Sequence, residues 1–126
     1  MEKQPRQRIV FILDHQPTFS ERLGQAIQRL DPHIVVVTAS TRARGFELFW
    51  HYKPVLDLII FDIALDQGRT STIPLVKIMR YATRAHHLPL LAATCAHNTE
   101  LLAAGCTHAV TDFSGLPEQI IALLGR

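Results

Sequence analysis

Short apolar runs alternate with longer amphipathic stretches along the whole chain. The run RIVFIL at 8–13 is continuous, rich in β-branched residues and too short for a helix, which indicates a strand buried on both faces. The next stretch has apolar residues at spacings of four and three, as one face of a helix requires: Phe19, Leu23, Ile27 and Leu30. Thr18 and Glu21 form a capping-box pattern, so we expect Thr18 to be the N-cap of this helix, which Asp31-Pro32 ends.

The alternation continues to the end of the chain. Four more strands are predicted, at 34–38, 56–62, 88–94 and 108–112. Helices are predicted between and after them: at about 41–52, across Ile73, Val76, Ile78 and Met79, at about 97–104, and at 116–124. Pro74 fits the first turn of its helix, and Gly105 is expected to be an αL cap.

This order of elements defines the fold class. Five strands, each followed by a helix, require a parallel sheet covered on both faces, with right-handed crossovers. Five units are too few for an eight-stranded barrel, so an open, doubly wound α/β sheet is predicted. We expect residues 1–126 to form a single domain, with residues 1–7 as a flexible lead-in.

Composition and charge exclude several functions. The chain is 48% hydrophobic and 19% charged, and its net charge of +2 comes from scattered basic residues, which argues against nucleic-acid binding. No apolar run is long enough for a membrane span or a secretory signal. Cys95 and Cys106 lack metal-ligand spacing, so we expect reduced thiols in a cytoplasmic protein.

Two residue groups on the second predicted helix have simple interpretations. Arg42 and Arg44 are expected to face solvent. Phe46, Phe49 and Trp50 are assigned to the core, with a partner surface at Trp50 left open.

Polar residues gather at the predicted carboxyl ends of the strands, where open α/β sheets bind ligands: Asp14, His15, Asp62, Thr94 and Asp112. The glycine-rich loops of nucleotide binders and the GxSxG elbow are missing from the sequence. Carboxylates at adjacent strand ends suit Mg²⁺, and an exposed aspartate beside such an ion is a candidate phosphoryl acceptor. The alternative is that polar residues simply end the strands.

The sequence resembles a receiver domain of the bacterial response-regulator superfamily over nearly its whole length. The resemblance is carried by five segments: RIVFILDHQP, LDLIIFDIAL, LPLLAAT, AAGCTHAVTDF and PEQIIALL. It implies a flavodoxin-like, CheY-like sheet with strand order 2-1-3-4-5. It also implies that Asp62 accepts phosphate from a histidine kinase, that Thr94 senses the phosphoryl group, and that Asp14, Asp62 and the backbone carbonyl of Ala64 bind Mg²⁺.

The departures from the family pattern fall on this chemistry. His15 occupies the position of the second acid, and neutral imidazole is a poor ligand for Mg²⁺. Asp112 occupies the position of the family's lysine, which places an anion where a phosphoryl group would sit. Ala109 replaces the usual aromatic switch residue, and the helix after Thr94 is about one turn short.

We hypothesise that His15 and Asp112 hydrogen-bond and hold the pocket closed without metal. A rival interpretation gives Asp14, His15, Asp62 and Asp112 a mixed nitrogen and oxygen site for Mn²⁺ or Zn²⁺. The other histidines are weaker candidates for metal binding: His33 and His51 flank helix ends, and the pair His86-His87 is expected in a solvated loop.

The sequence therefore predicts a stand-alone, receiver-like signalling module and not an enzyme. It is expected to bind a protein partner, which would be a histidine kinase, a phosphotransfer protein or a downstream effector, and a homodimer remains open. One alternative is an ordinary Mg²⁺-dependent response regulator phosphorylated at Asp62. A second is a metal-dependent hydrolase on the same fold.

Overall fold

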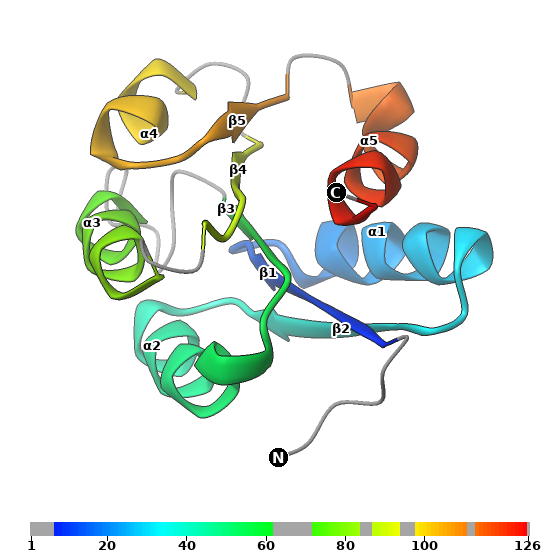
Figure 1. The fold of residues 1–126 in the computed structure, drawn as a ribbon, viewed down its shortest axis with the longest axis horizontal. Helices are drawn as coiled ribbons and strands as arrows, with labels where there is room; N and C mark the ends of the chain where they lie inside the picture. The colour runs from blue at the N-terminus through cyan, green and yellow to red at the C-terminus, as the bar shows by residue number, and fades with distance from the viewer. Residues whose placement is uncertain (1–6, 62–71, 84–86, 94–97, 111–112, 126) are drawn as a thin grey trace.

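The computed structural model describes residues 7–61, 72–83, 87–93, 98–110 and 113–125. Five strands and five helices alternate through these segments (Figure 1). The strands are β1 (Arg8–Leu13), β2 (Ile34–Ala39), β3 (Leu58–Phe61), β4 (Leu90–Ala92) and β5 (His108–Ala109). The helices are α1 (Pro17–Leu30), α2 (Arg42–Tyr52), α3 (Thr72–Thr83), α4 (Asn98–Ala104) and α5 (Leu116–Leu124), with short 3₁₀ turns at Lys53–Val55 and Phe113–Gly115.

The strands form one parallel sheet in the order β2-β1-β3-β4-β5. This order and the alternation of elements confirm the predicted α/β fold, which is doubly wound and flavodoxin-like. Helices α1 and α5 cover one face of the sheet, and α2, α3 and α4 cover the other (Figure 1). None of the described helices combines the length and apolar composition needed to cross a bilayer.

Each face of the sheet has its own hydrophobic core, because side chains alternate along each strand. Within β1, Val10 and Ile12 pack with α1 and α5, whereas Phe11 and Leu13 pack with α2 and α3. Strand β1, the continuous apolar run RIVFIL, is therefore buried on both faces, as predicted.

Gly45 explains how closely α2 lies on the sheet. A Cβ atom at this position would come within 2.4 Å of Leu13 Cδ2. The glycine costs helix propensity, but it lets α2 sit directly on the end of β1. The loop that carries Asp14 leaves β1 at this point.

The structure corrects two predictions about local detail. Gln16 is the N-cap of α1, and Thr18 lies inside the helix, so the capping-box prediction is wrong. Phe49 is fully buried as predicted, but Phe46 is 37% exposed and Trp50 48% exposed. These two side chains lie on the outer side of α2 because the helix presents only one face to the sheet.

Candidate functional site

The carboxyl ends of the central strands are aligned in the sheet. Leu13 pairs with Phe61, Phe61 with Ala92, and Ala92 with Ala109. Chain segments that follow these residues therefore leave the sheet at one edge, the edge where open α/β folds bind ligands. Asp14 and His15 follow β1 and are described; Asp62, Ala64, Thr94 and Asp112 lie outside the described residues, so their assigned roles stay predictions.

Asp14 is a buried carboxylate held at this edge by the backbone. Its N–H donates to the carbonyl of Ala39 at 3.1 Å, which continues the β1–β2 pairing by one residue. Its Oδ1 accepts from the N–H of Gln16 at 2.7 Å. This side-chain bond to the backbone two residues on turns the chain from β1 into α1, since Gln16 is the N-cap of that helix. Asp14 therefore has a structural role in addition to any chemical one.

His15 lies beside Asp14 but extends into solvent. Its side chain is 39% exposed, and its Nδ1 is 3.7 Å from Asp14 Oδ1, which is longer than a hydrogen bond. The imidazole thus stands next to the acid at the outer side of the edge. The family resemblance implies a pair of acids at residues 14 and 15. This chain has a carboxylate at residue 14 and an imidazole at residue 15.

The described donors fit Mg²⁺ poorly. One Asp14 oxygen already accepts a short backbone hydrogen bond, and His15 offers nitrogen to a cation that prefers oxygen. Among the described residues, no group of three or more His, Cys, Asp or Glu side chains is arranged to hold a metal ion. The mixed Mn²⁺ or Zn²⁺ site depends on Asp62 and Asp112 and so lies outside the described residues.

The proposed contact between His15 and Asp112 spans several strands. β3 and β4 lie between β1 and β5, so strands β1 and β5 are about 14 Å apart, from three strand spacings of roughly 4.8 Å. The two strands are therefore not adjacent, and the contact would depend on the loops that follow them. Because Asp112 lies outside the described residues, the pairing stays a prediction.

The short α4 is fixed to the strand that follows it. Asn98, the first residue of the described helix, is buried and donates from Nδ2 to the carbonyl of Val110 at 2.6 Å. The described helix has 7 residues, about two turns. Ala109 is partly buried against the core on the α2–α4 side of the sheet, at the position where the family resemblance would place an aromatic residue.

A second polar cluster lies at the opposite edge, where the strands begin. A cavity of about 630 Å³ is lined there by apolar residues and by Arg8, Asp57, His87 and His108. His87 is exposed as predicted and has a positive φ of 53°, and Asp57 Oδ2 accepts from the N–H of Ile9 at 2.8 Å. The prediction overlooked this cluster, although the sequence already placed a charged or titratable residue near the start of several predicted strands.

Similarity searches against solved structures return receiver domains. The signal receiver domain of a DNA-binding response regulator from Colwellia psychrerythraea 34H matches with a TM-score of 0.77 at 15% identity, over 94% of this chain and 99% of that one. A two-component response regulator from Clostridium difficile matches with a TM-score of 0.77 at 19% identity, over 94% and 97%. A response regulator from Burkholderia pseudomallei, whose structure contains a phosphorylated aspartic acid and a calcium ion, matches with a TM-score of 0.74 at 16% identity, over 93% and 66%. No family model and no curated protein matches the sequence.

At these identities the likeness defines the fold. The chain has the fold of response-regulator receiver domains over nearly its whole length, as the sequence resemblance predicted. The five-stranded order and the two helical layers are the features that the solved structures and this chain share.

Proposed function

We propose that this chain is a receiver-like signalling module of a two-component or phosphorelay-type system. It acts by binding another protein and not as an enzyme, and its phosphoacceptor site is atypical and weakened. The observation that carries the proposal is a receiver fold whose first strand ends in one buried acid, Asp14, followed by an exposed histidine. The module is proposed to work in the cytoplasm with a histidine kinase, a phosphotransfer protein or a downstream effector.

The weakening follows from charge and ligand chemistry. A phosphoryl group on Asp62 would need cations around it, and this chain has His15 and Asp112 where the family has an acid that binds metal and a lysine. Two unit charges at about 4 Å interact by ~4 kcal/mol at an effective dielectric near 20, so changing the lysine to an aspartate is a large penalty. Mg²⁺ would also lose a carboxylate ligand at residue 15.

The alternatives differ in what Asp62 does. In an ordinary response regulator, Asp62 accepts phosphate in the presence of Mg²⁺, as the phosphorylated aspartic acid in the Burkholderia structure illustrates for that protein. A metal-dependent hydrolase on the same fold would instead turn over a phosphoester or acyl substrate. The described residues at the carboxyl edge, Asp14 and His15, form no group of three metal ligands, and the acids Asp62 and Asp112 that a hydrolase would also need lie outside the described residues.

The proposal is tested with acetyl phosphate and Mg²⁺, followed by intact mass measurement. The wild-type chain is expected to gain little or no phosphate. The double variant His15→Asp/Asp112→Lys restores the usual charges and is expected to form the adduct faster by about tenfold or more, given the size of the charge penalty. Adding Asp62→Asn to the double variant should abolish the adduct.

Asp31→Asn is the matched control, because Asp31 lies in the turn after α1 and an asparagine oxygen still accepts from the N–H of His33. This control should leave the adduct of the double variant unchanged. Rapid, Asp62-dependent phosphorylation of the wild type would overturn the weakened site and establish the ordinary receiver. Asp62-dependent hydrolysis of a phosphoester would move the protein to the enzyme class.

A further inference from the structure

Exposed apolar side chains are concentrated on two neighbouring helices. Six large hydrophobic side chains are exposed among the described residues, and four of them belong to α2 and α3: Phe46, Trp50, Ile78 and Tyr81. Because most exposed hydrophobic residues occur singly, such a concentration marks a candidate interaction surface. The remaining two, Leu30 and Leu102, lie on α1 and α4.

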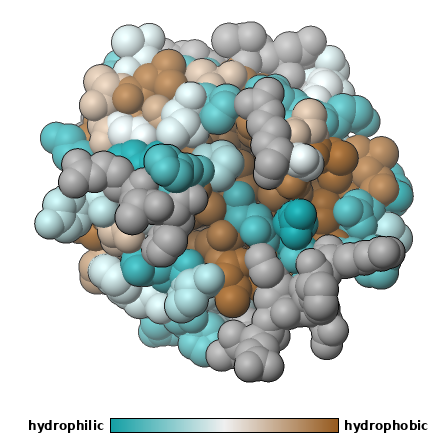
Figure 2. Space-filling model, viewed as in Figure 1, coloured by the Kyte–Doolittle hydropathy of each residue, from teal (hydrophilic) through white to brown (hydrophobic). Residues whose placement is uncertain are grey.

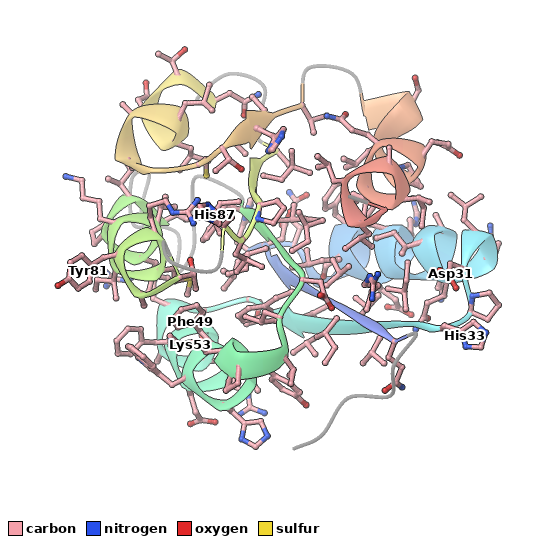
Figure 3. The ribbon with its side chains drawn as sticks, viewed as in Figure 1. Asp31, His33, Phe49, Lys53, Tyr81 and His87 are labelled. Carbon is pink, nitrogen blue, oxygen red and sulfur yellow. The ribbon has the colours of Figure 1, made fainter. Side chains whose placement is uncertain are left out.

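These side chains form two stripes along adjacent helices. Phe46 and Trp50 are four residues apart on α2 and touch edge to face, with ring centroids 5.8 Å apart. Ile78 and Tyr81 are three apart on α3, and Tyr81 is 77% exposed and points outward from that helix (Figure 3). Figure 1 shows α2 and α3 side by side on the same face of the sheet, in contact with each other.

A groove runs between the stripes. It has a volume of about 390 Å³ and is lined by Arg42, Ala43, Phe46, Pro74, Leu75 and Ile78. We call the groove together with Trp50 and Tyr81 the α2–α3 face. Figure 2 shows that hydrophilic and hydrophobic residues are intermixed over the face of the molecule in that view.

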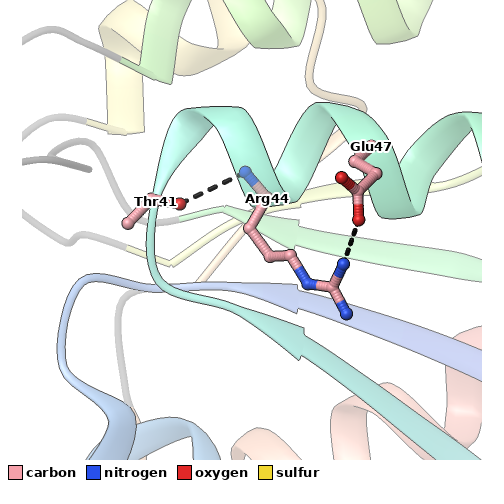
Figure 4. A network of polar contacts seen from close by, with 3 residues as sticks. All are labelled: Thr41, Arg44 and Glu47. Carbon is pink, nitrogen blue, oxygen red and sulfur yellow. Dashed lines mark hydrogen bonds and ion pairs between the residues drawn. The ribbon is translucent and has the colours of Figure 1, made fainter.

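Most of the described charged residues around the α2–α3 face are basic. Arg42 lines the groove, Lys77 is exposed beside Ile78, and α3 contains no Asp or Glu in its described range. The acid of α2, Glu47, pairs with Arg44, whose backbone N–H is bound by the Thr41 hydroxyl (Figure 4). The described charged residues of this face thus include three bases, Arg42, Arg44 and Lys77, and one acid, Glu47, so their formal net charge is basic.

We propose that the α2–α3 face binds an amphipathic helix of a partner protein that has acidic residues beside its apolar anchors. A groove between two helices with apolar walls suits a helix with anchors at i, i+3 or i+4, and i+7. The basic rim attracts acidic residues and opposes a second copy of the same surface, which would bring basic against basic. This inference rests on the proposed role in protein binding, but it requires no phosphorylation of Asp62.

The test is a phage-displayed library of random 16-residue peptides selected on the full chain. Enriched peptides are expected to combine the helical apolar spacing with an excess of Asp and Glu. Trp50 is the only tryptophan of the chain, so its emission reports binding directly. Binding of a synthetic copy of an enriched peptide should shift that emission to the blue as the indole leaves water.

Matched variants separate the α2–α3 face from general stickiness. Phe46→Gln/Ile78→Gln should weaken peptide binding at least tenfold, whereas Leu30→Gln/Leu102→Gln, at least as exposed on average but on other helices, should leave it unchanged. Lys77→Glu should weaken binding severalfold, less so at high salt. Circular dichroism verifies that each variant is folded.

Several outcomes would overturn the inference. These are no enrichment, enriched peptides without acidic excess, or equal loss of binding in the Leu30→Gln/Leu102→Gln control. A concentration-dependent dimer that Phe46→Gln/Ile78→Gln dissociates would assign the face to a second copy instead. The phosphorylation experiment does not depend on this face, so the signalling proposal and the docking proposal fail separately.

Discussion

At the scale of single residues, Gly105 combines a positive φ with a close approach to a neighbouring side chain. It ends α4 with a φ of +138°, beyond the αL value that the sequence predicted but still in the region that glycine tolerates. A Cβ at this position would lie 2.8 Å from Cβ and Cγ of Arg80. Both backbone strain and a side-chain clash therefore oppose any other residue here.

We accordingly predict that Gly105→Ala lowers the free energy of unfolding by about 2 kcal/mol or more. Urea unfolding followed by circular dichroism measures the change. Gly125→Ala is the control, because an added Cβ there meets only ordinary contacts at 3.6 Å and φ is −76°. Equal stability of the two variants would show that the backbone at Gly105 relaxes without cost.

Cys106 is a free, buried thiol, and Cys95 lies outside the described residues. Burial raises the pKa of the Cys106 thiol from 9.0 to about 12, with the charge of Arg80 opposing the shift. The folded thiol therefore keeps its proton over a pH range in which the unfolded thiol loses it.

This difference predicts a stability contribution that is complete below about pH 9 and lost as the pH rises toward 12. The decline should reach up to ~1.4 kcal/mol per pH unit within that range. The measurement compares urea unfolding of the wild type and Cys106→Ala at several alkaline pH values, since their difference removes the titration of all other groups. Parallel pH profiles for the two proteins would contradict the shift.

At the scale of elements, the residue that caps a helix is determined by where the backbone turns, and a capping-box sequence motif alone does not fix that position. Thr41 Oγ1 accepts from the N–H of Arg44 at 3.2 Å and caps α2 (Figure 4), whereas Thr18, the cap expected from its motif, lies exposed within α1. We predict that Thr41→Ala lowers the free energy of unfolding by about 1 kcal/mol.

Thr18→Ala provides the control for this prediction. Alanine has the higher helix propensity, so the change should be neutral or slightly stabilising. Both variants are compared by thermal and urea unfolding. A loss at Thr18 equal to that at Thr41 would restore the capping box that the sequence suggested.

The sequence predicted the type and order of all five strands and five helices because the apolar periods are strong. Within the described residues it overextended the later strands, because Leu56 and Asp57 precede β3 (Leu58–Phe61) and Val110 follows β5 (His108–Ala109). Apolar residues beyond a strand end can be buried outside the regular strand, as Val110 is, with its N–H donating to the carbonyl of Ala92 at 2.9 Å, so hydrophobicity alone overestimates strand length. The pattern likewise could not separate Phe49 from Phe46 and Trp50, since exposure depends on which side of α2 the sheet covers.

The candidate site was predictable as a location but only partly as a set of contacts. Parallel strands put their carboxyl ends at one edge, so Asp14 and His15 lie where the sequence placed them. The bond from the Gln16 N–H to Asp14 was not foreseen, because it depends on the turn into α1. The polar cluster at the opposite edge, with Arg8, Asp57, His87 and His108, was not predicted, because open α/β folds are expected to bind ligands at the carboxyl ends of their strands.

At the scale of the whole molecule, the two cores are coupled through a single sheet. Each strand of β1, β3 and β4 contributes side chains to both faces, so loss of packing on one face removes support from the other. Trp50 lies on the α2–α4 side, where its ring packs edge to face on the buried Phe49 with centroids 5.2 Å apart. Its fluorescence therefore reports on one face, while far-ultraviolet circular dichroism reports on the helices of both.

We predict that the chain unfolds as one cooperative unit, as the proposed single domain requires. Ile27 is a fully buried residue of α1 in the core on the sheet face opposite Trp50, and Ile27→Ala should lower the free energy of unfolding by about 2–5 kcal/mol. If the faces are coupled, Trp50 fluorescence and circular dichroism will report the same lowered urea midpoint in this variant. The contrary result would be a Trp50 fluorescence transition at the wild-type urea midpoint together with a circular dichroism curve in two steps. It would mean that the core under α2, α3 and α4 stays folded after α1 and α5 have unfolded.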